Sequence, residues 1–199
     1  KKTIKDFKNS ARLAFMAGYD GVEIHMAHGY LLHQFFSPLS NKRIDEYGLK
    51  DKLKYRIHIE IIKFIKKISK EKILGARVTG TDHLSNGTNL KDCINLVKKL
   101  KSNGLDYICV SSGGIIPKTN MKIREGFRVS IASKIKKECK ILTRTSGMIN
   151  DYKFIDKILK QKKIDFVAIG RKFISDKFFL FKDRKKRKND LPKQYTYCI

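Results

Sequence analysis

The sequence predicts an α/β fold in which helices cover a parallel sheet, and three observations support this. Helical stripes and short apolar runs alternate along nearly all of the 199 residues. The apolar runs are continuous, which is typical of strands buried between helices. Three helix-to-strand junctions also resemble one another, each with an aspartate before the strand: AGYDGVEIH, NGLDYICVS and KKIDFVAIG. This internal repeat indicates consecutive βα units, so a doubly wound sheet and a TIM barrel both fit.

Helical stripes followed by apolar runs define the first two units. Apolar residues spaced three and four apart predict a helix over residues 4–14, which ends at Gly18. Residues 20–25 then have the composition of a short buried strand. A second stripe predicts a helix over residues 57–68, and a strand over residues 72–79 follows it.

The remaining units follow the same pattern. A third helix, over residues 90–100, is stopped by Asn103-Gly104, a pair that favours the left-handed backbone of a helix end. The elements predicted after it are a strand at 105–111, a helix at 131–135, a strand at 140–144, a helix at 154–159 and a strand at 164–169. Five such units are fewer than the eight of a TIM barrel, so a barrel interpretation implies missing units.

The charge is strongly positive, with 45 Lys and Arg against 19 Asp and Glu and a net charge of +26. Clustered cations bind nucleic acid by releasing phosphate counterions. Here 35 of the cations are Lys, and most are spread over the exposed faces of predicted helices. This distribution favours compositional drift, so we expect no nucleic-acid partner. One dense basic run predicts a C-terminal tail at residues 182–199, outside a folded domain at residues 1–181.

Cysteine usage and hydropathy indicate an intracellular protein. The four cysteines lie far apart and form no CxxC pair, so neither a disulfide framework nor a zinc site is predicted. No apolar stretch reaches the roughly 18 residues of a membrane span, and we therefore expect a cytoplasmic location and no membrane partner. The chain opens at Lys1 in a polar stretch, without an initiator methionine or a signal-peptide core, and we expect a fragment.

An HxxH motif follows the first predicted strand, where parallel α/β folds place their functional residues. His25 and His28 form this motif. Two imidazoles in one loop can donate paired hydrogen bonds to a carbonyl or phenolate oxygen, which polarises it. The motif alone also fits a structural role or metal ligation, but no nearby carboxylate or cysteine completes a zinc set.

The ends of other predicted strands carry groups suited to an anion. Arg77 ends the second strand, and a guanidinium is costly to bury there unless it meets an anion or an electron-rich group. Gly147 and Gly170-Arg171 follow the last two strands, where TIM barrels commonly hold a phosphate. Glycine is equally common in ordinary turns, so the spacing alone leaves both interpretations open.

Residues 17–48, AGYDGVEIHMAHGYLLHQFFSPLSNKRIDEYG, closely resemble the old yellow enzyme family of FMN-dependent ene-reductases and NADPH dehydrogenases. The similarity continues through GARVTGTD, LDYICVSSGG, TSGMI and FVAIGRKF in the family's order, and HxxH is similar to its thermophilic-like bacterial branch. The resemblance implies a TIM (β/α)₈ barrel, of which this chain supplies about strands four to eight, a truncated barrel. It further implies a missing N-terminal half as a partner, and it is compatible with a homo-oligomer.

The resemblance also implies the substrate site. His25 and His28 would be the catalytic pair that binds the activating oxygen of the substrate above the flavin. Met26, Ala27 and Tyr30 would complete the substrate-binding motif. The implied reaction transfers hydride from NAD(P)H through FMN to an electron-poor alkene or a quinone.

The implied cofactor is FMN, and no metal is expected. Arg77 would lie at the pyrimidine edge of the flavin, and Gly147, Gly170 and Arg171 would hold its phosphate. The alternative function is a non-catalytic remnant, or a basic binding protein that retains part of the barrel scaffold. Because the first strands of the barrel are missing from this sequence, we expect these residues alone not to form a competent enzyme.

Overall fold

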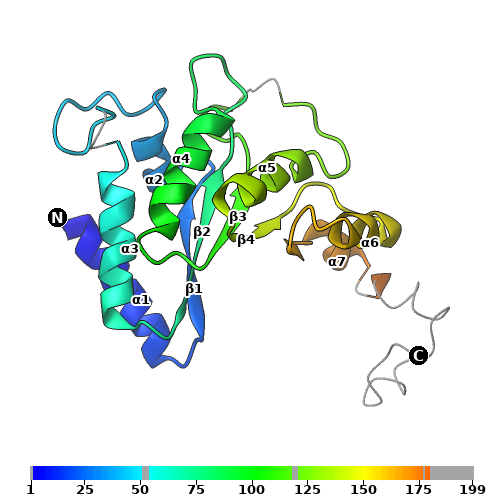
Figure 1. The fold of residues 1–199 in the computed structure, drawn as a ribbon, viewed down its shortest axis with the longest axis horizontal. Coiled ribbons are helices and arrows are strands. Elements are labelled where there is room, and N and C mark those ends of the chain that lie inside the picture. The colour runs from blue at the N-terminus through cyan, green and yellow to red at the C-terminus, as the bar shows by residue number, and fades with distance from the viewer. Residues whose placement is uncertain (1, 51–53, 118–120, 177, 180–199) are drawn as a thin grey trace.

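A computed structural model describes residues 2–50, 54–117, 121–176 and 178–179 (Figure 1). Its elements in chain order are α1 (Lys2–Met16), β1 (Gly21–Met26), α2 (Leu31–Phe36), α3 (Arg56–Ile68), β2 (Ile73–Thr79), α4 (Leu90–Lys101), β3 (Tyr107–Ser111), α5 (Val129–Cys139), β4 (Leu142–Thr145), α6 (Tyr152–Lys160), β5 (Phe166–Val167) and α7 (Arg171–Ser175). The expected basic tail at residues 182–199 lies outside the described residues.

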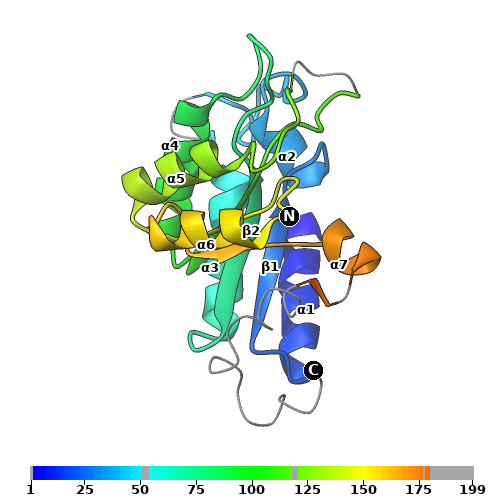
Figure 2. The same cartoon turned by 90° about the vertical axis from the view of Figure 1, so that its right-hand side faces the viewer.

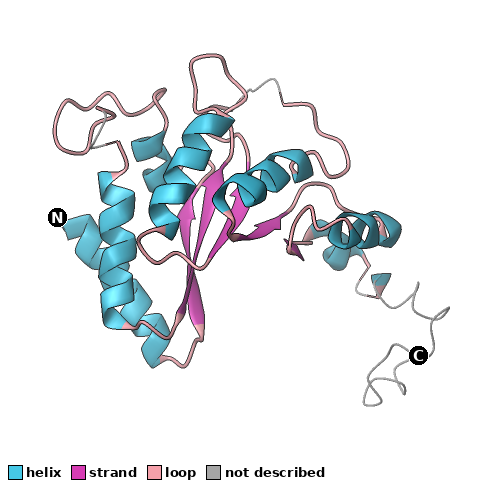
Figure 3. Cartoon of the chain, in the orientation of Figure 1, coloured by secondary structure: helices cyan, strands magenta, loops and turns pink. Residues whose placement is uncertain are grey.

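The five strands form one sheet in the order β1-β2-β3-β4-β5, and every neighbouring pair is parallel (Figure 3). The predicted parallel sheet is thus confirmed. Successive helices pack side by side along the sheet, α1 against α3, α3 against α4 and α4 against α5 (Figure 2). Within the described residues β1 and β5 form the edges of this sheet, which corresponds to part of a barrel.

The two faces of the sheet differ in polarity. Ile24, Ala76 and Ile108 are buried in the apolar core. Because side chains alternate along a strand, the next residues, among them His25 and Arg77, lie on the opposite face. Strands of continuous apolar character were expected, and the structure instead places charged residues on one face of β1 and β2. This polar face carries the candidate site.

The aspartates of the internal repeat have a physical role. Asp106 precedes β3, and its Oδ2 accepts the backbone N–H of Leu74 at 2.7 Å and an Nζ proton of Lys66 at 2.7 Å. Asp165 precedes β5 and accepts in the same way from the backbone of Thr143 at 2.9 Å and from Lys136 at 2.8 Å. These two aspartates therefore join the start of one strand to the start of its neighbour and to a helix, whereas the side chain of Asp20, the first aspartate of the repeat, is 96% exposed.

Two short elements differ from the sequence-based prediction. α2 was not predicted, because it has only six residues and its N-cap residue Tyr30 makes no side-chain cap hydrogen bond. β5 has two residues, whereas a strand over residues 164–169 was predicted. As an edge strand of the described sheet, β5 pairs on one side only.

Candidate active site

A row of functional side chains crosses four strands on the polar face of the sheet. His25 of β1 is in register with Arg77 of β2, which is in register with Cys109 of β3. Cys109 in turn is in register with Arg144 of β4. Parallel pairing therefore aligns one imidazole and two guanidinium groups that are far apart in the sequence.

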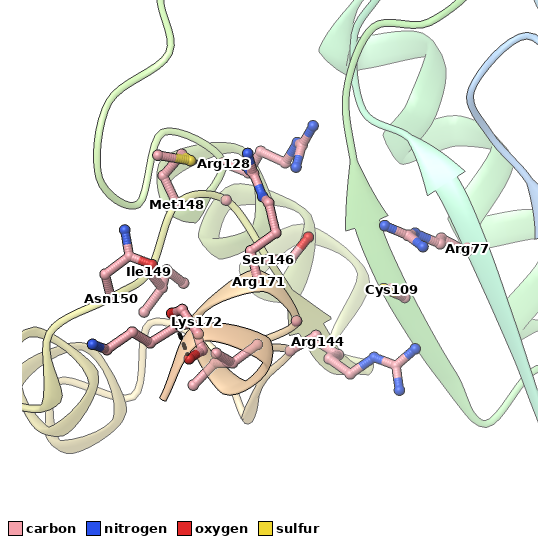
Figure 4. Close-up of a pocket in the computed structure, with 15 residues that line it drawn as sticks. Arg77, Cys109, Arg128, Arg144, Ser146, Met148, Ile149, Asn150, Arg171 and Lys172 are labelled. Carbon is pink, nitrogen blue, oxygen red and sulfur yellow. Dashed lines mark hydrogen bonds between the residues drawn. The ribbon is translucent and has the colours of Figure 1, made fainter. Parts of the chain in front are cut away.

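A cleft of about 900 Å³ opens beside this row (Figure 4). Arg77 and Cys109 border it from the sheet, Arg128 reaches it from the loop before α5, and Arg171 reaches it from the start of α7. Its further lining residues are Arg144, Ser146, Gly147, Met148, Ile149, Asn150, Ala168, Ile169, Gly170, Lys172 and Ser175. None of these described lining residues is acidic, so the cleft carries a concentrated positive charge.

Two of the cations in the cleft have carboxylate partners. Arg144 donates to Glu23 of β1 at 2.5 Å, and its guanidinium lies 5.6 Å from the ring centre of Tyr107. A Cβ atom at Gly75 would come within 2.1 Å of the Tyr107 ring, so only glycine leaves room for that ring. Nζ of Lys172 lies 3.5 Å from Oδ2 of Asp176.

Three cations in the cleft have no carboxylate partner among the described residues: Arg77, Arg128 and Arg171. The buried Nε of Arg77 makes no hydrogen bond to any described residue. Among the described residues Arg171 donates only to the weak acceptor Sδ of Met148, at 3.0 Å. Burial, together with the charges of Arg77 and Arg171, lowers the pKa of Arg128. Such a cluster is suited to binding an anionic ligand.

The two glycines that were expected to hold a phosphate both line this cleft. A Cβ atom at Gly170 would meet no protein atom within 4 Å, so a ligand can approach its backbone closely. Gly147 has φ of +142°, a backbone conformation that residues other than glycine rarely adopt. A Cβ atom there would lie 3.1 Å from the Phe127 ring. Gly170 therefore fits an anion held by its backbone and by Arg171, whereas the φ of Gly147 and the nearby Phe127 ring explain why that position is a glycine.

The HxxH motif brings three rings together at the end of β1. The ring centroids of His25 and His28 lie 5.1 Å apart, and those of His25 and Tyr30 lie 5.2 Å apart. His28 Nε2 is 2.6 Å from Ser111 Oγ at the end of β3. No described residue makes a hydrogen bond to Nδ1 of His28, so this nitrogen is available to a ligand.

Met26 and Ala27 do not face this group. Their exposed fractions are 1% and 0%, and both side chains pack in the core. Their place in the substrate-binding motif stays a prediction.

Both histidines of the motif favour the neutral form. Burial, and then the charge of Arg77, lowers the pKa of His25. The same two causes, in the same order, lower the pKa of His28 to about 4. A neutral imidazole carries one N–H, so near neutral pH the pair offers two hydrogen-bond donors and no net charge. That combination suits an oxygen that gains negative charge.

Comparison with known proteins identifies the family. Residues 1–190 match the model of the NADH:flavin oxidoreductase / NADH oxidase family, whose flavin is FMN. The chain belongs to this family. A relative named NADPH dehydrogenase in Bacillus subtilis (strain 168) is 37% identical over 197 residues, which are 99% of this chain and 58% of that protein. Another of that name, in Listeria monocytogenes serotype 4b (strain CLIP80459), is 36% identical and covers 98% of this chain.

Solved structures show the same fold. A 2-naphthoyl-CoA reductase complex matches with a TM-score of 0.85 and 25% identity, over 93% of this chain and 29% of that one. Morphinone reductase matches with a TM-score of 0.71 and 25% identity, over 91% of this chain and 49% of that one. The neighbours are TIM barrels, and the chain spans about 58% of the length of the curated relatives it matches. The expected partial barrel is thus confirmed.

Two further findings concern metals and membranes. Within the described part of the chain, no three His, Cys, Asp or Glu side chains lie close enough together to hold a metal ion. No helix there is both long and apolar enough to cross a bilayer.

Sequence reasoning missed some residues of the cleft, above all Arg128. Arg128 precedes α5 in a loop, where no periodic pattern indicates which way a side chain points. Its Nε donates to Ser112 Oγ at 3.0 Å, and its guanidinium lies 4.3 Å from the ring centre of Phe127. Arg144 was included in a predicted strand, but no role was assigned to it.

Proposed function

We propose that this chain forms the flavin-phosphate and substrate-binding part of an FMN-dependent NAD(P)H oxidoreductase. The proposed acceptor is an activated alkene or a quinone. The observation that carries the proposal is the alignment of His25 with Arg77 across β1 and β2, beside a cleft rich in cations. In the proposed function this alignment would bring a donor for a substrate oxygen next to a cation for the flavin.

The residues of the cleft fit FMN. Gly147, Gly170 and Arg171 would hold its phosphate. Gly170 supplies open backbone, Gly147 lines the same cleft, and Arg171 has no carboxylate partner among the described residues. Arg77 would lie at the pyrimidine edge, where its unpartnered Nε could donate to the ring. When bound, FMN supplies hydride transfer between the nicotinamide and the acceptor.

The histidine pair would bind and polarise the substrate. His25 and His28 would each donate one hydrogen bond to the carbonyl oxygen of the acceptor, through nitrogens that carry a proton in the neutral ring. His25 is in register with Arg77, and its ring centroid lies 5.1 Å from that of His28, so the acceptor oxygen would be held close to the flavin. Tyr30, 64% exposed, would border the entrance.

The active form needs further strands. The open edges of β1 and β5 would pair with an N-terminal segment that supplies the first three strands of the family's barrel. We call this chain joined to such a segment the completed protein. Within this proposal residues 1–181 belong to the barrel, residues 182–199 form a basic tail and the location is the cytoplasm.

Ligand binding to the FMN-loaded completed protein tests the proposal. A phenolate stacked on oxidised flavin gives a long-wavelength charge-transfer band, so 4-hydroxybenzaldehyde is a suitable probe. We expect the band in the wild-type protein and in the His83→Ala control. His83 is a half-buried residue of the loop after β2, so this variant removes an imidazole that is not part of the HxxH motif. We expect the His25→Ala/His28→Ala variant to keep its flavin and lose the band.

Two results would count against this function. A completed protein that folds without retaining FMN would favour the non-catalytic remnant. A band of undiminished strength in the double variant would show that the two histidines do not bind the ligand.

A further inference from the structure

The loop that carries His28 has a strained backbone. His28 has φ of +60°, a left-handed conformation that is uncommon for a residue other than glycine, and Gly29 follows with φ of +76°. A Cβ at Gly29 would lie 2.3 Å from the carbonyl oxygen of Gly114, and one at Gly114 would lie 2.7 Å from Cα of His28. The backbone of this loop therefore packs in close contact with the backbone of the loop after β3. Strain of this kind persists only where the surroundings hold it.

The side chain of His33, on α2, makes a hydrogen bond to the backbone of this loop. The backbone N–H of Gly29 donates to His33 Nδ1 at 2.9 Å. A backbone N–H can only donate, so Nδ1 is the acceptor and the ring proton lies on Nε2. The backbone N–H of His28 donates to Thr79 Oγ1 at 3.2 Å, which adds a second tether.

Asp82 fixes the orientation of the His33 ring. Its Oδ1 lies 2.9 Å from His33 Nε2, and both side chains are fully buried. The other oxygen, Oδ2, accepts from Ser37 Oγ and from the backbone N–H of Thr88, each at 2.7 Å. Burial by itself would raise the pKa of Asp82, but the hydrogen bonds from His33, Ser37 and Thr88 outweigh it and lower that pKa. The two hydrogen bonds to Oδ2 thus hold the carboxylate in one place, with Oδ1 directed at the His33 ring.

We propose that the buried His33–Asp82 pair positions the substrate-binding histidines by holding the loop of residues 28–29 in its strained conformation. The inference rests on the proposed function, because it assigns a role to residues that support the HxxH motif. His33 is a positioning residue, since it is linked to the site through Gly29. The pair would fix the loop before a ligand arrives, so that binding does not have to order it.

Two conservative substitutions separate the two hydrogen bonds of His33. In His33→Asn the amide oxygen can take the place of Nδ1 and accept from Gly29. In His33→Gln the longer amide can take the place of Nε2 and donate to Asp82, but the bond to Gly29 is lost. We expect His33→Gln to weaken 4-hydroxybenzaldehyde binding to the FMN-loaded completed protein by roughly tenfold or more, and His33→Asn to restore most of the affinity.

His58→Gln is the matched control. His58 is also fully buried on a helix, and its Nε2 lies 2.8 Å from the carbonyl oxygen of Leu32, but it makes no bond to residues 28–29. We expect this variant to lose stability and keep its affinity for the phenol. We expect FMN affinity to stay unchanged in all three variants, and Gly29 amide exchange to be faster in His33→Gln alone.

Several outcomes would overturn the inference. These are wild-type phenol affinity in His33→Gln, equal losses in His33→Gln and His33→Asn, a comparable loss in His58→Gln, or loss of FMN along with the phenol. A wild-type completed protein that holds FMN but gives no charge-transfer band would instead overturn the proposed function, and this inference with it.

Discussion

Replacing Arg171 by alanine should weaken FMN binding selectively. Arg171 lines the cleft next to Gly170, and its guanidinium has no carboxylate partner among the described residues. A charge-assisted hydrogen bond contributes about 1.5 to 3 kcal/mol. Arg171 is exposed, so solvent screening places the loss near the low end of that range. We expect the FMN dissociation constant of the completed protein to rise roughly tenfold or somewhat more.

The assay is a fluorescence titration of FMN into the apoprotein at two salt concentrations. Lys172→Ala is the matched control, because it removes the neighbouring cation of the same cleft, which already pairs with Asp176 at 3.5 Å. We expect a smaller effect there, and a weaker salt dependence of FMN binding in Arg171→Ala than in the wild type. Equal affinities of wild type and Arg171→Ala, or a larger loss in Lys172→Ala, would refute the assignment of the phosphate to Arg171.

Further measurements address the cofactor, the histidine pair and the buried His58. We expect FMN and not FAD to co-purify with the completed protein, because the family resemblance places a single monophosphate site at Gly170 and Arg171; full occupancy by FAD would contradict this. Chelators should leave turnover unchanged, because in the proposed function His25 and His28 bind substrate and not metal. A loss of turnover on chelation that added metal restores would point to a metal site. Complete burial lowers the pKa of His58 to about 4, below its ordinary 6.5, so the folded state releases the proton that the unfolded state keeps. The free energy of unfolding should therefore fall by about 3 kcal/mol as the pH drops from 6.5 to 4, measured by urea unfolding of the completed protein. In His58→Gln the free energy of unfolding should change less with pH. An unchanged pH dependence in this variant would show that His58 does not cause the fall.

The sequence was sufficient for the order of the βα units. Each long helix has an apolar stripe, and each repeated aspartate marks the start of a strand, as Asp106 and Asp165 do. The short elements were harder to predict. The six residues of α2 contain too few turns to show a helical period, and the ends of β5 depend on which strands pair with it.

Some members of the candidate site were predicted from the sequence, but its arrangement was not. The HxxH motif and the strand-end Arg77 were visible in the sequence, whereas their alignment depends on strand register, which no local pattern specifies. Arg128 and the His33–Asp82 pair were missed for a related reason. Their roles arise from contacts between loops and helices that lie far apart in the chain, such as the bond of His33 to Asp82.

The central claim is that this chain provides the substrate and flavin-phosphate sites of an NAD(P)H oxidoreductase. Steady-state NADPH consumption with 2-cyclohexenone, together with product formation, tests it most directly, in the chain alone and in the completed protein. We expect negligible turnover by the chain alone, because β1 and β5 have no partner on their outer side among the described residues and the barrel needs further strands to close. We expect the completed protein to form one product per NADPH consumed. A completed protein that holds FMN but consumes no NADPH in response to the enone would contradict the claim, and robust turnover by the chain alone would contradict its dependence on further strands.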